Sequence, residues 1–258
     1  MNSKHHDLEF HIEAIEERRM LAGHVTAVIT NAGDLKITGD NVSNRVDVTI
    51  VDGDTIKLED LGAGGNTAIN EGAPGEAVFL PHGQLRDLKV NMKGGNDLFA
   101  IYSGFSFRKG TVKGGSGNDL LSIRGNYSRN LKLSLGSGIV GLLTWGSFDQ
   151  SASTNADVGG KIIVKGGTTN DRIVFGEDVG GRVTVNSGSG NDFVRFSDHE
   201  FNGAVSVKLG AGNDDLEITN STFFASARFN GGPGADEFID GGSNVFAFSL
   251  RFLGFEIP

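Results

Sequence analysis

The chain has 258 residues, with 40 Gly, 4 Pro, no Cys and a formal net charge of −9 at pH 7. The lack of cysteine excludes disulfides and thiolate metal sites, and many glycines beside few prolines indicate tight turns rather than collagen or a proline-rich linker. The negative charge argues against a nucleic-acid partner and is compatible with cations. No apolar run of about 18 residues is present, so no transmembrane segment is predicted.

Residues 1–24 differ in pattern from the rest of the chain. They contain no glycine before Gly23, and Leu8, Ile12 and Ile15 have a helical spacing, which predicts a short amphipathic helix. The stretch IEERRMLA, residues 15–22, resembles the LEPR-XLL motif near the N-terminus of many surface and secreted proteins of planctomycete bacteria, with Ile, Glu and Met in place of Leu, Pro and Leu. The resemblance implies a sorting role and an extracellular or cell-surface location. The alternative is a helix that only caps the β structure behind it.

Residues 25–85 indicate an irregular β region that leads into the repeats. Short strands are predicted over Val25–Thr30, Asp34–Thr38, Arg45–Val51 and Thr55–Leu58. Turns rich in Gly, Asn and Asp separate them, so hairpins are expected. The stretch GAGGN, residues 62–66, imitates the later glycine turns but lacks their aspartate, and it is interpreted as an entry coil or a loop.

From residue 86 to residue 258 a glycine turn, an aspartate and an apolar run return every 21 or 22 residues, with one longer step of 31 residues. The equivalent positions are Asp97, Asp119, Val140, Asp171, Asp192, Asp214 and Asp236. A fixed period of this length is typical of stacked repeats. The longer step contains an insertion around Trp145–Asn155, which we expect to bulge from one corner.

Apolar residues alternate on both sides of each turn. They stand two and four residues after the aspartate and seven and nine residues before it, as in Phe99, Ile101, Val90 and Leu88. This period of two is typical of half-buried strands. A third, shorter wall is expected at Tyr127, Val158, Val179, Phe201 and Phe223. One such coil cannot bury its inner face alone, so we predict an all-β fold, a right-handed parallel β-helix (β-solenoid) of about seven coils.

The Phe-rich segment Val245–Phe255 follows the last turn and lacks an aspartate turn of its own. We expect it to close the last coil. The alternative is an adhesive edge for a second copy or for a continuation of the chain.

The stacked aspartates suggest a reason for a bound cation. Successive coils lie about 4.8 Å apart, and unit charges at that distance repel by roughly 3 kcal/mol at an effective dielectric of 20. Ca²⁺ takes 6 to 8 oxygen ligands, which carboxylates and turn carbonyls can supply. Aspartates turned into water are one alternative. Another is a purely structural Asn-Asp turn, since Asn96, Asn118, Asn170, Asn191 and Asn213 precede the aspartate and can bond to the next coil.

Two turns, GGSGNDLLS (114–122) and GGPGADEFI (231–239), match the pattern G-G-x-G-x-D-x-U-x. This pattern resembles the nonapeptide of the repeats-in-toxin (hemolysin-type) family, which binds Ca²⁺ in a parallel β-roll. That family has two such turns per coil and this chain has one, so the resemblance implies a single row of calcium sites along one corner. The predicted metal-site residues are Asp97, Asp119, Asp171, Asp192, Asp214, Asp236, Gly115, Gly117, Gly188, Gly190, Gly210, Gly212, Gly232 and Gly234. No ion is expected beside Val140.

The sequence therefore favours a calcium-binding structural or surface-interaction module outside the cytoplasm, with extracellular polysaccharide or surface proteins as further partners. The alternative is a polysaccharide-binding or polysaccharide-modifying β-helix protein of the lyase or epimerase kind, a fold analogy only. Its best cluster is Arg195, Asp198, His199 and Glu200, with Arg172 one coil below, and no catalytic residue is assigned. Adhesion through outward-facing Leu98, Leu120 and Phe193 is a third reading.

Overall fold

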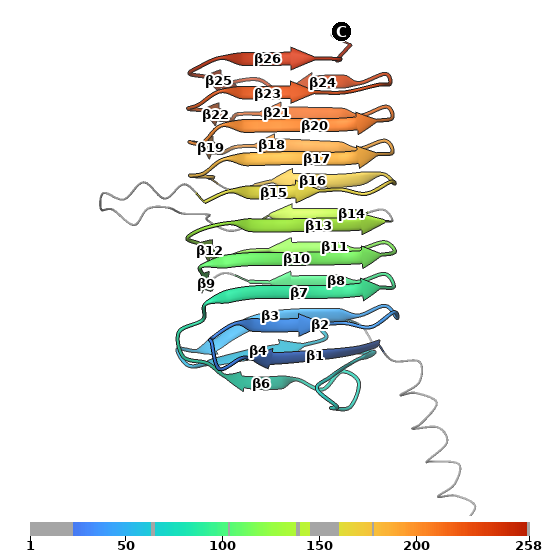
Figure 1. The fold of residues 1–258 in the computed structure, drawn as a ribbon, viewed down its shortest axis with the longest axis vertical. Coiled ribbons are helices and arrows are strands. Elements are labelled where there is room, and N and C mark those ends of the chain that lie inside the picture. Colours follow the sequence, from blue (N-terminus) through green and yellow to red (C-terminus); the bar gives the residue numbers. More distant parts are fainter. Residues whose placement is uncertain are drawn as a thin grey trace, which may run out of the picture.

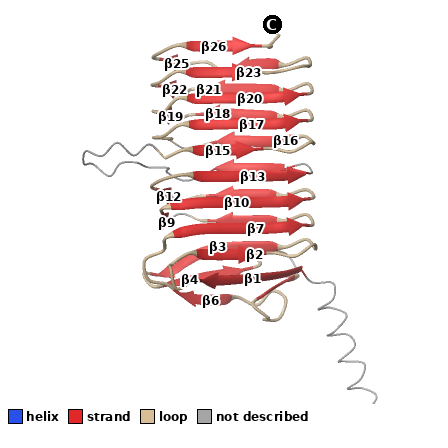
Figure 2. Cartoon of the chain, in the orientation of Figure 1, coloured by secondary structure: helices blue, strands red, loops and turns tan. Residues whose placement is uncertain are grey.

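The computed structural model describes residues 23–62, 65–102, 104–137, 140–144, 160–176 and 178–256, and every regular element in these ranges is a β-strand. Figures 1 and 2 show the strands stacked into a column of coils. The expected N-terminal helix with its LEPR-XLL-like stretch, the insertion Trp145–Asn155 and Val158 of the third wall lie outside the described residues.

Two long, mainly parallel sheets form the walls of the solenoid. The first sheet contains β7 (Asp87–Gly94), β10 (Lys109–Ser116), β13 (Leu131–Ser137), β15 (Ile162–Lys165), β17 (Val183–Ser189), β20 (Val205–Ala211), β23 (Ala227–Asn230) and β26 (Leu250–Leu253). The second contains β8 (Leu98–Ile101), β11 (Leu120–Ile123), β14 (Val140–Thr144), β16 (Asp171–Phe175), β18 (Phe193–Ser197), β21 (Asp215–Thr219) and β24 (Glu237–Asp240). In Figure 1 the first sheet runs to the right in front and the second returns behind it as the chain climbs, which is a right-handed path of about six turns.

The register within each sheet follows the sequence period. Val112 of β10 pairs with Val90 below it and with Leu133 above it, and in the second sheet Leu121 pairs with Phe99. The register also continues across the long step, because β13 pairs with β15 and β14 with β16. The insertion therefore leaves the stack of coils intact.

A third wall of two-residue strands closes the other side of the coil. It contains β9 (Ser106–Phe107), β12 (Asn126–Tyr127), β19 (Glu200–Phe201), β22 (Thr222–Phe223) and β25 (Val245–Phe246). β12 pairs with β9, and β22 pairs with β19 and β25. The strands β25 and β26 of the Phe-rich C-terminal segment pair with β22 and β23, and β26 is the last strand of the first sheet.

The N-terminal region contains the expected hairpins. Its strands are β1 (Gly23–Ile29), β2 (Leu35–Thr38), β3 (Arg45–Asp52), β4 (Thr55–Glu59), β5 (Thr67–Ile69) and β6 (Val78–Pro81), and the pairs β1–β2 and β3–β4 are antiparallel. β2 and β3 also pair in parallel with β7 and β8. The hairpins thus form a layer that continues both sheets and covers the start of the solenoid.

One hydrophobic core runs through the whole stack. Aromatic rings line up from coil to coil, with ring centroids 4.9 Å apart for Phe175 and Phe196 and 5.0 Å apart for Phe201 and Phe223. Such pairs add roughly 0.5–1.5 kcal/mol beyond the area they bury. Because inward apolar residues repeat in every coil, the interior supplies most of the stability. The corner positions can therefore hold polar side chains.

Candidate functional site: the aspartate column

Six aspartates lie inside the corner where strands of the first sheet turn into the second. We call Asp97, Asp119, Asp171, Asp192, Asp214 and Asp236 the aspartate column, and all six are buried, with exposed fractions between 0% and 3%. Alternation along the strand explains this burial. The aspartate has the same parity as the inward residues two and four positions later, so its side chain points into the corner.

One oxygen of five of the six carboxylates, those of Asp97, Asp119, Asp192, Asp214 and Asp236, accepts a hydrogen bond from the backbone of the layer below. The Asp97 N–H donates to Asp119 Oδ1 (3.0 Å), the Asp192 N–H to Asp214 Oδ1 (2.7 Å) and the Asp214 N–H to Asp236 Oδ1 (3.0 Å). The Asp171 N–H donates in the same way to Asp192 Oδ1 (2.8 Å). The column is therefore a ladder of side chain–backbone bonds that joins successive coils.

The asparagines beside the column form a second ladder in the opposite direction. The Asn118 N–H donates to Asn96 Oδ1 (2.8 Å), and the Asn213 N–H donates to Asn191 Oδ1 (2.9 Å). At the last turn the Ala235 N–H donates to Asn213 Oδ1 (3.0 Å). Asparagine thus bonds to the coil above and aspartate to the coil below, and together they satisfy the N–H groups of a corner where the sheet ladders end.

The N-terminal layer provides the first step of both ladders. The Asn44 N–H donates to Asp97 Oδ1 (2.8 Å), and the Asn96 N–H donates to Ser43 Oγ (2.9 Å). Sequence reasoning missed these two residues because their spacing from the first repeat is not the coil period. The turn Gly39–Asn41 between two predicted strands was the available signal.

The glycines predicted as metal-site residues shape the turn. Gly115 and Gly117 have φ values of 126° and 115°, which disfavour other residues. A Cβ on Gly115 would also overlap the Lys93 carbonyl oxygen of the coil below. The equivalent glycines Gly188, Gly190, Gly210, Gly212, Gly232 and Gly234 also have positive φ and the same close approach. Glycine is required here for close stacking of the turns.

Several turn carbonyls already accept hydrogen bonds from neighbouring coils. The Gly210 N–H donates to the Gly231 carbonyl oxygen (2.7 Å), and the Gly190 N–H donates to that of Ala211 (2.9 Å). The Gly117 N–H donates to the Ser137 carbonyl oxygen (2.6 Å). These oxygens have one lone pair left, so they are weaker candidates for an ion than free turn carbonyls.

The second carboxylate oxygen is the unusual atom of the column. For Asp97, Asp119, Asp214 and Asp236 it is buried and has no hydrogen-bond partner among the described residues. In the Asp171 coil the corresponding oxygen accepts the Gly167 N–H (2.9 Å). Buried unpartnered carboxylate oxygens are rare and point to a proton, a water or an ion.

The residue five positions before the aspartate lies next to that oxygen. A Cβ on Gly114 would overlap Asp119 Oδ2 and come within 2.6 Å of the Leu135 carbonyl oxygen. At Gly231 the side-chain position is lined in the same way by Asp236 Oδ2 and the Gly254 carbonyl oxygen. In these coils a carboxylate oxygen and a carbonyl oxygen lie so close to the glycine that no side chain fits at this position.

The Asp97 and Asp214 coils have an apolar residue at this position. Met92 and Leu209, both fully buried, stand in register with Gly114 and Ser187 of the neighbouring coils. The inner corner of these coils therefore contains an apolar side chain where the Asp119 and Asp236 coils have glycine.

Burial raises the pKa values of the column. It raises the pKa of Asp97 to about 7 and that of Asp214 to about 6, and neighbouring carboxylates of the column add to both shifts. Burial also raises the pKa values of Asp119 and Asp192. A carboxylate that gains one N–H bond but loses its water is easier to protonate, because the bond does not replace full hydration.

The donor set fits calcium in part. Ca²⁺ takes 6 to 8 oxygens, and the Asp119 and Asp236 coils each bring one carboxylate oxygen and one carbonyl oxygen together. Within the described ranges no group of three or more His, Cys, Asp or Glu could hold a metal. The Asp97 and Asp214 coils fit less well than sequence reasoning expected. Calcium binding by the column stays a prediction, most favoured at the two turns that match the full nonapeptide.

The cluster considered for catalysis is divided between two parts of the coil. His199 lies 3.2 Å from Asp178, and the Glu200 N–H donates to the same carboxylate (2.8 Å), near the third wall. Arg195 instead pairs with Glu217 (3.4 Å) on the second sheet. The five residues therefore do not converge on one point.

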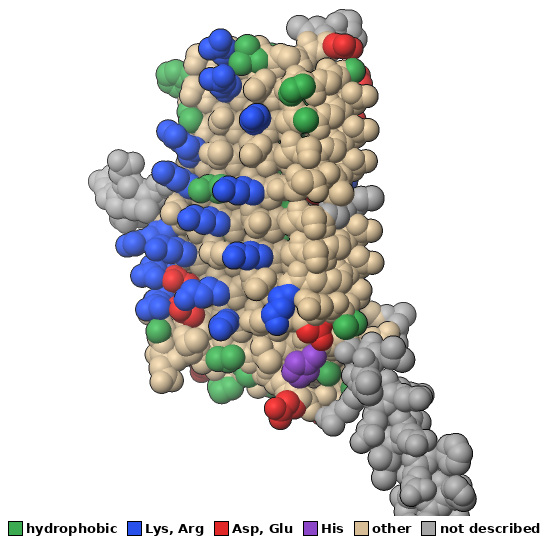
Figure 3. Space-filling view, turned by 45° about the vertical axis from the view of Figure 1, so that its right-hand side comes forward, with side chains coloured by type: hydrophobic (Ala, Val, Ile, Leu, Met, Phe, Trp, Pro, Cys, Tyr) green, Lys and Arg blue, Asp and Glu red, His purple; other side chains and the backbone are tan. Residues whose placement is uncertain are grey.

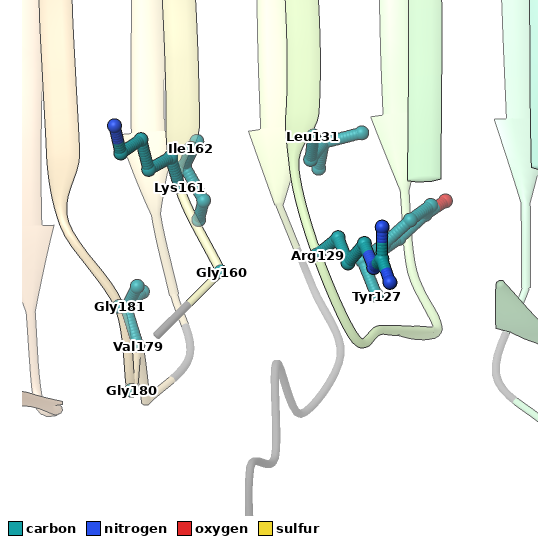
Figure 4. Close-up of a pocket in the computed structure, with 9 residues that line it drawn as sticks. All are labelled: Tyr127, Arg129, Leu131, Gly160, Lys161, Ile162, Val179, Gly180 and Gly181. Atoms are coloured by element: carbon teal, nitrogen blue, oxygen red, sulfur yellow. The ribbon is translucent and has the colours of Figure 1, made fainter. Parts of the chain in front are cut away.

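A small cavity lies beside the third wall, where Tyr127, Gly160 and Val179 approach one another (Figure 4). Its volume is about 20 Å³, which is room for roughly one water molecule. The cavity is too small for a sugar ring and holds no carboxylate, so it does not favour the enzyme reading.

The outward apolar residues do not form a broad patch. Leu120 is 36% exposed, Leu98 is half-buried, and Phe193 is half-buried with the Arg172 guanidinium 4.2 Å from its ring centroid. These side chains give little support to adhesion through an apolar strip on this sheet.

Comparisons with protein-family models, curated proteins and solved structures found no match to this chain. In the part that the structure describes, no helix is long and apolar enough to span a membrane. The class that fold and site define is therefore a parallel β-solenoid repeat protein with a buried aspartate column.

Proposed function

We propose that this protein is a rigid structural or surface-interaction module outside the cytoplasm that binds calcium along its aspartate column. One observation carries the proposal. The buried, unpartnered oxygens of Asp119 and Asp236 each lie near a backbone carbonyl oxygen of the next coil, beside Gly114 and Gly231. An unpaired buried carboxylate is costly, and a cation removes that cost.

Asp119 and Asp236 would hold the ion with the carbonyl oxygens of Leu135 and Gly254. The ion would neutralise buried carboxylates and link each coil to the next, which stiffens the stack. An extracytoplasmic location is supported by the LEPR-XLL-like and repeats-in-toxin-like stretches. Extracellular calcium modules work with dissociation constants of roughly 10⁻⁴–10⁻³ M, so a partial ligand set that binds weakly suits that setting.

Thermal unfolding followed by circular dichroism tests this proposal. The unfolding midpoint should rise along a calcium series and stay constant with magnesium, because a ligand of the folded state alone adds about 2.7 kcal/mol at one hundred times its dissociation constant. The informative variant is Asp119→Asn with Asp236→Asn. Asparagine keeps an Oδ1 acceptor for the ladder but removes the charge, so the fold should remain and the calcium response should fall.

The matched control is Asp215→Asn with Glu237→Gln, which neutralises the outward residues next to Asp214 and Asp236 in the chain. This control should respond to calcium as the unchanged protein does. Coincident curves for the unchanged protein in EDTA and in calcium would overturn the proposal and leave the column as a hydrogen-bond ladder alone.

A further inference from the structure

Lysine and arginine side chains gather on the outer face of the first sheet, although the chain is acidic overall (Figure 3). We call this set the basic face. Its members are Lys36, Arg86, Lys89, Arg108, Lys109, Lys113, Arg129, Lys132, Lys161, Lys165, Arg182, Lys208, Arg228 and Arg251. These fourteen residues are more than half of the 23 Lys and Arg of the chain.

Strand alternation places the nine members that lie within strands outward and in rows along the stack, and the other five lie one or two residues before a strand of this sheet. Lys89, Thr111 and Lys132 share one register, and Lys113 and Lys165 stand in the next outward row. Neighbouring coils lie about 4.8 Å apart, so seven steps from β7 to β26 extend the rows over roughly 34 Å. The basic face is therefore long and follows the stack of coils.

Few acidic groups reduce its charge. Among the described residues of the first-sheet strands and the one residue directly before each strand, Asp34 and Asp87 are the acidic side chains, and they pair with Arg86, Lys89 and Arg108. Fourteen cations less two anions leave an excess of twelve positive charges. No ion pair within the described residues involves Lys113, Lys132 or Lys165.

The second sheet differs, since its outward positions near the C-terminal end include Asp215, Glu217 and Glu237. The net charge of −9 therefore does not describe the basic face, where cations outnumber anions. A local field of one sign attracts a partner of the other sign regardless of the total charge.

We infer that the basic face binds an extended acidic polysaccharide, one with carboxylate groups on its sugars. In the row of Lys113, Lys165 and Lys208 a cation recurs at every second coil, and such a row suits a linear polyanion that lies along the stack. A nucleic acid fits less well, because the described outward positions of these strands carry no aromatic side chain for base stacking. A lipid surface also fits less well, because membrane-bound faces carry apolar anchors such as Trp or Phe.

This inference rests on the proposed surface-interaction role but uses other residues than the aspartate column and needs no calcium. The test is isothermal titration with polygalacturonate in EDTA at 0.15 M salt, with the neutral polymer dextran as control. The variant is Lys113→Gln with Lys132→Gln and Lys165→Gln. These side chains are exposed, so the unfolding midpoint should not change while the dissociation constant rises at least about tenfold.

The matched control neutralises three cations away from the basic face, with Lys57→Gln, Arg172→Gln and Arg195→Gln. It should bind polygalacturonate as tightly as the unchanged protein, and dextran should bind to neither. The Asp119→Asn, Asp236→Asn variant should also bind normally, which separates this inference from the calcium proposal.

Three results would overturn the inference. They are no binding of polygalacturonate, equal binding by the three-lysine variant, or tighter binding of single-stranded oligothymidine or of vesicles with anionic lipid. The last result would assign the basic face to a nucleic acid or to a membrane instead.

Discussion

Buried aspartates occur in two regions of this molecule and behave in opposite ways. Asp34 in the N-terminal layer is 4% exposed, and its carboxylate accepts hydrogen bonds from Arg86 (2.8 Å) and Lys89 (2.6 Å), which lower its pKa to about 2. Asp97 at the corner is 2% exposed and accepts backbone and amide N–H bonds from Asn44, and burial raises its pKa to about 7.

The difference shows that burial alone does not set the charge of a carboxyl group. Cations at hydrogen-bond distance keep Asp34 ionised, whereas burial raises the pKa of Asp97, whose hydrogen-bond donors from Asn44 are uncharged. In the N-terminal layer the negative charge stabilises the fold at pH 7. At the corner the same charge costs stability unless a proton or a metal ion removes it.

The largest expected effect comes from the geometry of the corner. Gly212 has a φ of 142°, and a Cβ there would overlap the Gly190 carbonyl oxygen. Gly212→Ala should lower the free energy of unfolding by on the order of 3 kcal/mol. Gly83→Ala is the control, because a Cβ on Gly83 meets no atom within 4 Å. Urea unfolding measures both, and equal stabilities would show that the turns do not need their close stacking.

The next effect is the dependence of stability on pH in EDTA. The raised pKa values of Asp97 and Asp214 mean that their contribution is fully present below the ordinary value of 3.8 and is lost as the pH rises through about 6 to 7. The lowered pKa of Asp34 acts the other way, since its contribution is lost as the pH falls toward about 2. The unfolding midpoint should therefore be higher at pH 5 than at pH 8 and should fall again in strong acid.

A variant with Asn at positions 97 and 214 separates the two limbs of this pH profile. In this variant the unfolding midpoint should decline less between pH 5 and pH 8, and it should still fall in strong acid. A midpoint that rises steadily from pH 5 to pH 8 in the unchanged protein would contradict the assigned role of the corner aspartates.

The smallest effects come from single substitutions at pH 8 in EDTA. Asp34→Asn should cost about 1 kcal/mol, less than the pKa shift alone suggests, because the Arg86 and Lys89 side chains are 43% and 52% exposed. Asp214→Asn should cost nothing or add stability, because asparagine still accepts the Asp192 N–H. Equal losses from the two changes, measured by chemical unfolding, would remove the distinction between the regions.

Much of the fold was predictable because the repeat fixes the length of each coil and which alternate residues point inward. The columns of Val90, Val112 and Leu133 lie in register as the sequence indicates. The N-terminal hairpins could be predicted from their turn residues. The way in which they join the solenoid could not be predicted from the sequence. That junction aligns Asn44 with Asp97 over 53 residues and depends on tertiary pairing between β3 and β8.

The candidate site was only partly predictable. The aspartates were predicted from the sequence. Asp119 is two and four residues from the inward Leu121 and Ile123, so strand alternation implies that its side chain also points inward. The hydrogen bonds of the aspartates to the preceding coil were not readable from local sequence, because the donor lies 21 or 22 residues away. The basic face was hidden for a different reason, since a net charge adds together surfaces that the two sheets hold apart.

The opposed directions of the two ladders have a consequence for how such a chain changes length. Every regular coil offers an asparagine oxygen upward and an aspartate oxygen downward, and it presents the matching N–H groups to its neighbours. A unit of 22 residues can therefore be duplicated or lost with the new junction satisfied at once. Stacks of different heights are thus accessible by tandem duplication within a gene, without any other substitution at the corner.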